Sequence, residues 1–591
     1  MQSAYETICL LMPPADASSK SVQQKRSALG RPASWKFGIE SLKPLLWPAL
    51  LAVIVFAVYS PSLKFGFILD DHRFTGDPRI QESGHIFDYF SNYVWAQFSG
   101  GPPSFYRPVF VLWMRINFVL AELSTWGWHF LSITKHLLVG IVLWLLIYKL
   151  LGDRVVAFVA AALFVLHPSH TESVSWVTVP DPLLTLGLLL SLLFYLKHLE
   201  RLPVRIDTPA RKSRKAAARA SHRPSGTWLM ASVAAYFAAL LAKESAIVFP
   251  AVMVVLALSV DGTGPASDTR SPSKRDDARP RVFVHLGLFA VVSLVYLLIR
   301  WNALSGKLAP ATQHLPSSTV VLSWPATLWF YMKAVLWPLK SYSFADPTLI
   351  DHFSARGVLL PLFALICCAG LLVAAIVWAW RTAQSQLSEG EAAKVRFGLI
   401  AGNLLLVLPL LLTLNLNALN PGDFLHGRYV YLPLAGVSIL VAIGLRLASK
   451  LRLALLCAVG ALAVAFVPCT WSQEKQWSDD STVFTKAHEL APNNRPVARN
   501  LADTHVRAAL LIADEGRCSE AMPVFDEVNR EFPDNWYTWA GRGICFVRMN
   551  DLVKAEDSFH RAADLSHDPA VIQQWQALRA QMGLSTSVPA D

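Results

Sequence analysis

Two adjacent carboxylates, Asp70 and Asp71, follow the first long apolar run of the sequence, within the segment FILDDH. Neighbouring acidic groups raise each other's pKa, so one of them can act as a base towards an incoming hydroxyl, or the pair can bind a metal ion. The alternative is a helix-end pair that faces water, which is the commoner arrangement of adjacent acidic residues. Asp70 and Asp71 are our candidate catalytic residues.

A second group lies in the segment HPSHTE, where His167, His170 and Glu172 fall within six residues. Imidazole and carboxylate groups so spaced can bind a divalent cation or an acceptor molecule. Three ligands without a fourth match no standard metal site, so a hydrogen-bonded turn is an equally good interpretation. We expect these residues to line a pocket, and the metal is left open.

Candidate phosphate-binding residues occur at two further places. Lys243 and Glu244 are the only charged residues of a 34-residue apolar stretch, and such a pair indicates a tight outer turn with a cation for a lipid phosphate. Arg428 and Tyr429 lie in GRYVYLP, where the arginine can bind phosphate with its planar donors or simply reach the membrane surface. We predict that Arg428, Lys243 and Tyr429 bind the phosphate of a donor.

The last candidates lie beside the second apolar run. Tyr106 and Arg107 precede an amphipathic segment, which by itself is typical of an interfacial anchor helix, and His136 lies near the outer end of the run. Ionisable residues beside apolar spans are costly to keep there, so each is a functional candidate. The predicted acceptor or pocket residues are Tyr106, Arg107, His136, His167, His170, Glu172 and Glu244.

The composition shows what must position these residues. The chain has 591 residues, of which 53% are hydrophobic and 16% charged, and its mean hydropathy is +0.38. It is too apolar for a soluble enzyme of this size, so lipid must be part of its solvent. The net charge of +11 does not indicate nucleic acid, because the cations gather in short segments between apolar runs, as in cytoplasmic loops of membrane proteins.

Apolar runs predict an all-α membrane domain over residues 44–470 with about eleven helices, at 44–63, 130–150, 155–170, 179–197, 228–242, 245–260, 282–300, 357–380, 398–416, 430–448 and 452–470. With residues 1–43 as a basic cytoplasmic tail, the odd count places the loops 64–129 and 301–356 and the C-terminal part outside. A twelfth span at 319–339 would invert every later loop. We therefore interpret this stretch, which is rich in Pro and Trp, as re-entrant or interfacial.

Residues 471–591 lack such runs and repeat with the period of a tetratricopeptide helix pair: Ala521 and Phe525 recur as Ala555 and Phe559. A generic bundle of helical hairpins is the alternative. Pro492 and Pro533, at corresponding places of the two units, are 41 residues apart and not 34, which predicts about two extra helical turns in the first unit. Of its two cysteines, Cys518 and Cys545, we expect unpaired buried thiols rather than a disulfide.

Taken in order, these motifs and the following repeats resemble the transmembrane and tetratricopeptide-repeat O-mannosyltransferases and their bacterial relatives, which belong to the GT-C glycosyltransferases. The resemblance extends from residue 44 to about 565. It implies transfer of a sugar from a polyprenyl-phosphate donor on the outer face, with inversion. One of the two adjacent aspartates would be the base. Arg428, with Lys243 as a weaker candidate, would stabilise the leaving phosphate, and His136, His167, His170 and Glu172 would shape the pocket.

The sequence departs from the family pattern at three places. The family usually has Gly-Arg-x-Asp after the histidine motif, whereas here Asp181 is kept and the arginine is missing. An Asn-Pro pair that often follows the acidic pair is Asp77-Pro78 here. The tail holds two or three repeats where the family commonly has more, which puts a long peptide-binding groove in doubt.

The leading hypothesis is an inverting membrane glycosyltransferase that moves a mannose-like sugar from a polyprenyl phosphate to a hydroxyl of a protein or lipid. No cofactor is implied beyond the open divalent cation. The expected setting is the bacterial inner membrane with the repeats in the periplasm, or the endoplasmic reticulum in a eukaryote. The alternative is a non-catalytic anchor whose repeats recruit protein partners. A transporter would need charges along a midplane path and repeated halves, which the sequence lacks.

Overall fold

The structure is a computed structural model that describes residues 45–97, 105–201, 226–261, 279–306, 314–340, 343–347, 349–418 and 425–584. In these ranges helices are joined by loops, and the β-structure consists of an isolated antiparallel bridge between Ala345 and Leu425. The predicted all-α class is confirmed. The predicted tail 1–43 and the basic cluster 211–223 lie outside the described residues.

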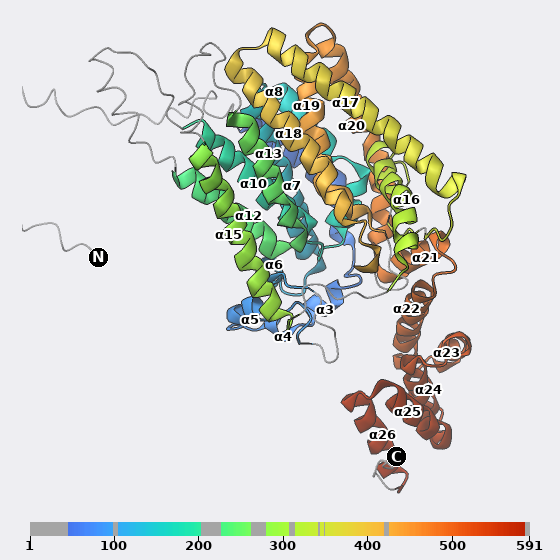
Figure 1. Ribbon diagram of the computed structural model, residues 1–591. Helices are drawn as coiled ribbons and strands as arrows, with labels where there is room; N and C mark the ends of the chain where they lie inside the picture. The colour runs from blue at the N-terminus through green and yellow to red at the C-terminus, as the bar shows by residue number, and fades with distance from the viewer. Residues whose placement is uncertain are drawn as a thin grey trace, which may run out of the picture. The chain divides into compact units, whose positions relative to one another are not determined.

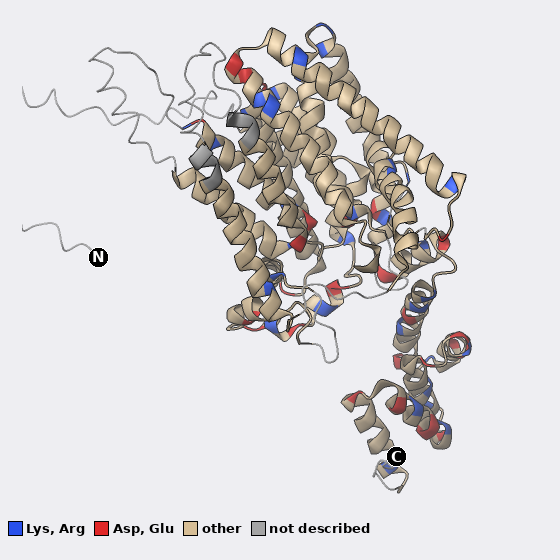
Figure 2. Cartoon of the chain, viewed as in Figure 1, with Lys and Arg blue, Asp and Glu red and all other residues tan. Residues whose placement is uncertain are grey.

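Eight helices of the described part are long and apolar enough to cross a membrane (Figure 1). They are Leu46–Lys64, Thr125–Leu151, Asp181–Leu199, Val284–Ala303, Ala355–Gln386, Glu389–Leu412, Gly427–Leu447 and Ser449–Trp477. The pair Arg154–Val165 and Pro168–Ser175, bent by 57° at its break, is either a ninth span or a re-entrant loop. Figure 2 shows long stretches of these helices without a charged residue. The chain is a polytopic membrane protein.

Two shorter apolar helices, Gly226–Ala242 and Glu244–Ala257, lie at the remaining predicted spans, so each of the eleven positions holds an apolar helix. The count of eleven crossings stays a prediction, because these two helices and the bent pair are short for a bilayer. The stretch 319–339 forms a helix, Ser317–Leu336, of 20 residues with Pro325 inside it. It is not among the eight spanning candidates, and its re-entrant or interfacial placement also stays a prediction.

The elements of the membrane part are α2 (Leu46–Tyr59), η1 (Ser60–Lys64), α3 (Asp71–Thr75), α4 (Pro78–Gln81), α5 (Ile86–Ser91), α6 (Pro108–Ala121), α7 (Thr125–Leu151), α8 (Arg154–Val165), η2 (Pro168–His170), α9 (Thr171–Ser175), α10 (Asp181–Leu199), α12 (Gly226–Ala242), η3 (Glu244–Val248), α13 (Phe249–Asp261), α15 (Arg279–Ala303), α16 (Ser317–Leu336), η4 (Ala355–Leu359), α17 (Leu360–Gln386), α18 (Glu389–Leu412), η5 (Leu416–Ala418), η6 (Gly427–Val430), α19 (Tyr431–Leu447), η7 (Ser449–Leu451), α20 (Arg452–Glu474) and η8 (Lys475–Trp477).

Small residues let the helices that carry the candidate residues pack closely. α18 and α19 meet at Gly402 and Gly436, where a Cβ on Gly436 would lie 2.5 Å from the Gly402 carbonyl oxygen. Gly187 of α10 lies against Ala239 of α12, and a Cβ added to Gly187 would lie 2.8 Å from the Cβ of Ala239. Close contact of this kind is how helices associate in lipid. It fixes the ends of α10, α12 and α19, from which the charged candidates extend.

Six helices follow the membrane part: α21 (Asp480–Leu490), α22 (Arg495–Asp514), α23 (Cys518–Glu531), α24 (Trp536–Arg548), α25 (Leu552–Ser566) and α26 (Pro569–Gln581). Phe525 and Phe559, the recurring phenylalanines, pack on Gly541 and Gly543 of α24. α22 has 20 residues and α24 has 13, so the two extra turns predicted for the first unit are present. We call α21–α26 the repeat segment, and its tetratricopeptide nature stays a prediction.

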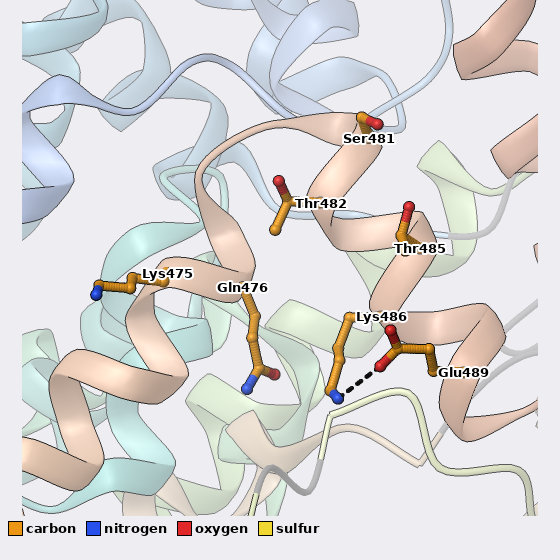
Figure 3. Close-up of a pocket in the computed structure, with 7 residues that line it drawn as sticks. All are labelled: Lys475, Gln476, Ser481, Thr482, Thr485, Lys486 and Glu489. Atoms are coloured by element: carbon orange, nitrogen blue, oxygen red, sulfur yellow. Dashed lines mark hydrogen bonds and ion pairs between the residues drawn. The ribbon is translucent and has the colours of Figure 1, made fainter.

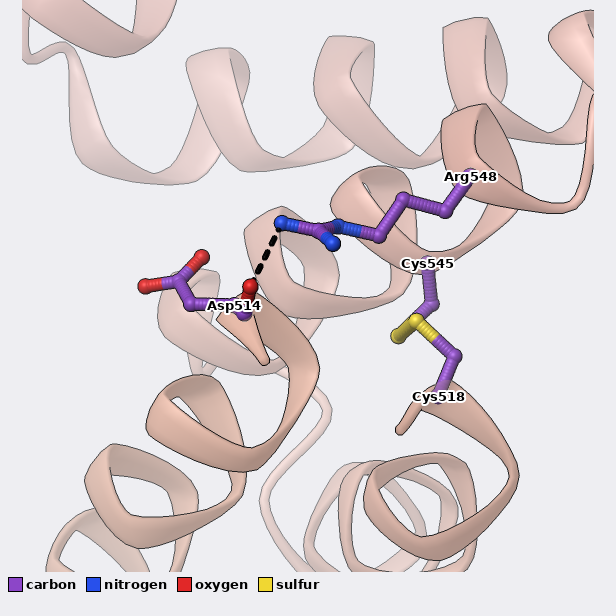
Figure 4. The surroundings of a disulfide bond; sticks show 4 residues. All are labelled: Asp514, Cys518, Cys545 and Arg548. Atoms are coloured by element: carbon purple, nitrogen blue, oxygen red, sulfur yellow. Dashed lines mark hydrogen bonds between the residues drawn. A yellow bond between two sulfur atoms is a disulfide. The ribbon is translucent and has the colours of Figure 1, made fainter. Parts of the chain in front are cut away.

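The two cysteines of the repeat segment are joined in a disulfide, so the expectation of unpaired thiols was wrong. Cys518 begins α23, Cys545 lies in α24, and their Cα atoms are 5.4 Å apart (Figure 4). Beside the disulfide, Arg548 donates a hydrogen bond of 2.8 Å to the Asp514 carbonyl. Sequence spacing alone could not pair them, because the pairing depends on how α23 and α24 pack. Stable disulfides are typical of oxidising compartments.

The first helix of the repeat segment packs into the membrane part rather than standing apart from it. Val483, Phe484 and Ala487 of α21 share a buried apolar core that also contains Ile68, Trp176, Val179, Phe344, Trp477 and Val497. Asn494, the N-cap of α22, donates a hydrogen bond of 2.6 Å to Asp346. α21 is therefore fixed beside the loop that carries the acidic pair.

Candidate active site

The two adjacent carboxylates at the start of α3 have different surroundings. Asp71 is fully buried, and its Oδ1 accepts hydrogen bonds from the backbone N–H (3.2 Å) and hydroxyl (2.7 Å) of Thr178. Its Oδ2 accepts from the Ile68 N–H at 3.2 Å. Burial, with a smaller contribution from the charge of Asp70, raises the pKa of Asp71 to about 7 against the three hydrogen bonds. Asp71 therefore fixes the loop to the segment before α10, and no face of it is open to a substrate.

Asp70 is the carboxylate that faces the site. It is partly exposed, and the charges of Arg73, Arg428, Arg107 and His426 act on it. Burial raises the pKa of Asp70, and these cations only partly offset the rise. A carboxylate with a raised pKa that is held among cations can accept a proton from a hydroxyl better than a free surface aspartate can.

Glu172 joins the histidine turn to the start of α19. This buried carboxylate accepts from the Ser343 hydroxyl at 2.9 Å and from the Arg428 backbone N–H at 3.0 Å. Its Oε1 is 2.8 Å from Nδ1 of His426. With both oxygens used by protein groups, Glu172 positions Arg428 and does not offer a free ligand to an acceptor or a metal ion.

The Arg428 guanidinium has donors to spare. It lies over the Trp176 ring at 4.7 Å, and its Nη1 is 3.6 Å from Glu172, too long for a hydrogen bond. Its Nε is buried and has no hydrogen-bond partner among the described residues, while the side chain as a whole keeps 17% exposure. A buried unpartnered donor of this kind is costly unless a ligand uses it, and guanidinium donors match phosphate oxygens.

Two further cations, Lys243 and Arg107, are each bound to a carboxylate. Lys243 donates to both oxygens of Asp181, at 2.7 and 2.8 Å, in a buried ion pair between the end of α12 and the start of α10. Arg107 donates to both oxygens of Glu244, at 2.8 and 2.5 Å. These pairs neutralise much of the charge on the two cations, so of these three cations Arg428 is the best placed to receive an added anion.

Tyr429 lies between two of these cations. The Lys243 ammonium is 4.9 Å from the centre of its ring, and the Arg428 guanidinium is 5.7 Å from it. Its ring also contacts those of His426 and Tyr331, at 5.7 and 6.2 Å. The aromatic side chain therefore holds the two cations in position.

All five sequence motifs contribute to this cluster, but four of the predicted pocket residues do not line it. His136 is buried, with one ring nitrogen 2.6 Å from the Tyr431 hydroxyl and the other 3.1 Å from the Val165 carbonyl. His167 caps η2 through the Ser169 N–H, and its other nitrogen contacts the Val335 carbonyl at 3.2 Å. His170 is buried between the rings of Tyr431 and Phe164, 4.3 and 4.5 Å away. The buried Tyr106 donates to the Phe90 carbonyl at 2.8 Å.

The structure adds three residues that the motif search did not select. Asp181 pairs with Lys243, His426 binds Glu172, and Trp176 supports Arg428. His426 directly precedes the GRYVYLP motif, and Asp181 is the aspartate retained from the family pattern, so both carried a usable signal. In the described part of the chain, no three His, Cys, Asp or Glu side chains are grouped closely enough to hold a metal ion.

A separate hollow of ≈ 320 Å³ lies where the membrane part meets α21 (Figure 3). All of its lining residues are polar or charged, and Lys486 is paired with Glu489 at 2.8 Å within it. None of the candidate site residues lines this hollow; its residues are Lys475, Gln476, Ser481, Thr482, Thr485, Lys486 and Glu489. The carboxylate and cations that could carry the chemistry lie elsewhere.

The fold and the site together define a class: a polytopic helical membrane protein in which loops and helix ends from distant parts of the chain bring a partly exposed carboxylate and an arginine together. No protein-family model matches the chain. Comparison with known proteins confirms the resemblance predicted from the motifs, over part of the chain.

A stretch of 131 residues is 34% identical to protein O-mannosyl-transferase TMTC3 of Mus musculus, covering 22% of this chain and 14% of that protein. A match to TMTC2 of Mus musculus is 33% identical over 149 residues and covers 24% of this chain and 18% of that protein. The matches thus span less than a fifth of these relatives' length. Among solved structures, the Archaeoglobus fulgidus oligosaccharyltransferase tethered with an acceptor peptide has a TM-score of 0.39 and 13% identity, over 78% of this chain and 59% of that one.

Proposed function

We propose that the chain is an inverting membrane glycosyltransferase that moves a mannose-like sugar from a polyprenyl phosphate to a hydroxyl group of a protein or lipid. The observation that carries the proposal is that one cluster contains both Asp70 and Arg428. Asp70 is partly exposed and faces cations, while Arg428 has an unpartnered buried donor. A base for a hydroxyl and a cation for a leaving phosphate are the two groups that this transfer requires.

In the proposed reaction, the Asp70 carboxylate takes the proton of the acceptor hydroxyl as its oxygen attacks the anomeric carbon. The new bond forms on the face opposite the phosphate, so the configuration inverts. The bond between the anomeric carbon and the phosphate oxygen breaks, and the electron pair leaves with the polyprenyl phosphate. A neutral alcohol is too weak a nucleophile to react at a useful rate without this proton transfer.

Arg428 stabilises the charge that develops on the leaving phosphate. Its buried Nε has no hydrogen-bond partner in the described part of the chain, and Trp176 and Tyr429 hold the guanidinium in place. Lys243 adds a weaker attraction, because Asp181 already neutralises it. Such preorganised donors act without the cost of reorienting during the reaction.

The proposed setting is the outer face of a bacterial inner membrane, or the lumenal face in a eukaryote. The disulfide between Cys518 and Cys545 supports an oxidising compartment for the repeat segment. Asp480 of α21 accepts a hydrogen bond from the Leu69 N–H and contacts Nε2 of His72, which supports the same side for the Asp70 loop. The sugar follows from the relatives' names, and a protein acceptor held by the repeat segment is part of the proposal.

The test is transfer by purified protein in lipid nanodiscs from radiolabelled polyprenyl-phosphate mannose to a peptide rich in serine and threonine and to extracted membrane lipids. Arg428→Gln removes the guanidinium, while Arg452→Gln, whose ion pair with Asp153 lies beyond the far end of α19, is the matched control. We expect kcat/KM to fall about 10- to 150-fold for Arg428→Gln, the effect of losing one hydrogen bond to a charged group, and to change little for the control.

Transfer from GDP-mannose instead of the lipid donor would contradict the proposal, as would equal activity of the two arginine variants. If the wild type transfers no sugar to either acceptor but binds a protein through its repeat segment, the alternative of a non-catalytic anchor would hold. An anchor has no need of a carboxylate held among cations next to an unpartnered arginine donor.

A further inference from the structure

The loop that carries the acidic pair is tied to the repeat segment by one carboxylate. Oδ1 of Asp480, the first residue of α21, accepts a hydrogen bond of 2.9 Å from the Leu69 N–H. Its Oδ2 lies 3.0 Å from Nε2 of His72. Asp480 thus holds the loop on both sides of Asp70 and Asp71, at residues more than 400 positions away in the sequence.

The hydrogen bond to Asp480 stabilises an unfavourable backbone conformation at Leu69. Leu69 has φ = 52°, in the left-handed region that a branched side chain rarely adopts. A strained conformation of this kind persists only when the surroundings enforce it. The peptide N–H that Asp480 accepts belongs to this residue, and the next residue is Asp70, so the strained peptide sets the direction in which Asp70 extends.

Asp480 itself is firmly placed. Its neighbours in α21 are buried with Ile68 and Trp477, and the Gly66 N–H donates a further 2.9 Å hydrogen bond to the Ser478 carbonyl. The hydrogen bonds from His72 and Leu69, with the charges of His72 and Arg507, hold the pKa of Asp480 below its usual value although burial opposes them. Arg507 of α22, which is 54% exposed, lies 3.3 Å from Oδ2.

We propose that Asp480 is a positioning residue for the transfer reaction: it holds the Leu69 peptide in its left-handed conformation and so aims the Asp70 carboxylate at the acceptor hydroxyl. This inference rests on the proposed function. On this inference the start of the repeat segment holds the Asp70 loop in its active conformation. A repeat domain that only recruits an acceptor would make no contact with that loop.

The experiment compares Asp480→Ala and Asp480→Asn with wild type in the nanodisc assay with polyprenyl-phosphate mannose. Asp534→Asn is the control, because it breaks an exposed ion pair with Arg499 inside the repeat segment and touches no part of the loop. We expect Asp480→Ala to lower kcat about 10- to 100-fold, as a small misplacement of a reacting group does, with KM for the donor unchanged within twofold. Asp480→Asn should lose less, because its amide oxygen can still accept from Leu69.

A second readout does not depend on activity. Hydrogen exchange in the peptides covering residues 66–75 should be faster in Asp480→Ala than in wild type and unchanged in Asp534→Asn. The inference is overturned if exchange in this loop is unchanged, or if Asp480→Ala keeps kcat within threefold of wild type, or if its loss is entirely in KM for the donor. Absence of transfer by the wild type would instead contradict the proposed function, while the exchange result would still decide whether Asp480 holds the loop.

Discussion

Asp71 offers a sharp test of how the two adjacent carboxylates divide their roles. Replacing Asp71 with Asn keeps Oδ1, which accepts both hydrogen bonds from Thr178, and turns Oδ2 into an NH₂ group that meets the Ile68 N–H donor. One hydrogen bond is lost and two buried donors face each other, which costs roughly 1–3 kcal/mol. We expect a lower Tm but retained transfer, because Asp71 is fully buried behind Thr178.

The pH dependence gives this prediction its sign. The pKa of Asp71 rises from 3.8 to about 7 in the folded chain, a difference worth roughly 4 kcal/mol. Between these values the folded chain holds a proton that the unfolded chain has lost, so the contribution of Asp71 to stability is largest at low pH and falls as pH rises towards 7. Asn has no such dependence. The Tm deficit of Asp71→Asn should therefore shrink, or reverse, as pH rises through this range.

The assay is thermal unfolding in detergent, followed by tryptophan fluorescence at several pH values, with transfer measured on the same preparations. A Tm deficit that grows with pH would contradict the raised pKa of Asp71. An Asp71→Asn protein that unfolds like the wild type at every pH but has lost transfer would contradict the division of roles, because Asp71 would then act in the chemistry and not in holding the loop.

Two further predictions concern the buried ion pair and the disulfide. Lys243→Met should lower the free energy of unfolding by about 3–5 kcal/mol, because it leaves Asp181 buried and unpaired. The double variant with Asp181→Asn should recover most of the loss in Tm. Equal Tm values for the single and double variants would contradict this. Changing both Cys518 and Cys545 to Ser should destabilise the repeat segment by roughly 3–4 kcal/mol. The variant's repeat segment should be cleaved faster by a protease than that of the wild type, and dithiothreitol should not change the variant's cleavage rate. Cleavage at the wild-type rate would contradict this prediction.

The placement of helices could be predicted from the sequence because the length of an apolar run is a direct consequence of the bilayer. Each of the eleven predicted positions holds an apolar helix, although the number that cross the membrane is not settled by length alone. The convergence of the five motifs was also predictable, since charge bias in the loops placed them on one side of the membrane. Asp480 contacts the Asp70 loop, so the acidic pair and α21 lie on a common side, and the assignment of that side to the outer face stays a prediction.

The partners of individual side chains could not be predicted. A histidine near a helix end has the same sequence signature whether it lines a pocket or binds a backbone carbonyl. His136 and His167 bind backbone carbonyls, and His170 is buried against aromatic rings. Adjacent aspartates look equivalent in the sequence, and only the Thr178 contacts separate them. The ion pair between Lys243 and Asp181 depends on how α10 and α12 pack, which no local motif encodes.

The central claim is that Asp70 takes the proton of the acceptor hydroxyl. The direct measurement is single-turnover transfer, with enzyme in excess over polyprenyl-phosphate mannose, by wild type and by Asp70→Asn, in which the shape is kept and the base is lost. We expect a fall of about 100- to 10,000-fold in the transfer rate with donor binding unchanged. A single-turnover rate for Asp70→Asn within threefold of the wild type would contradict it.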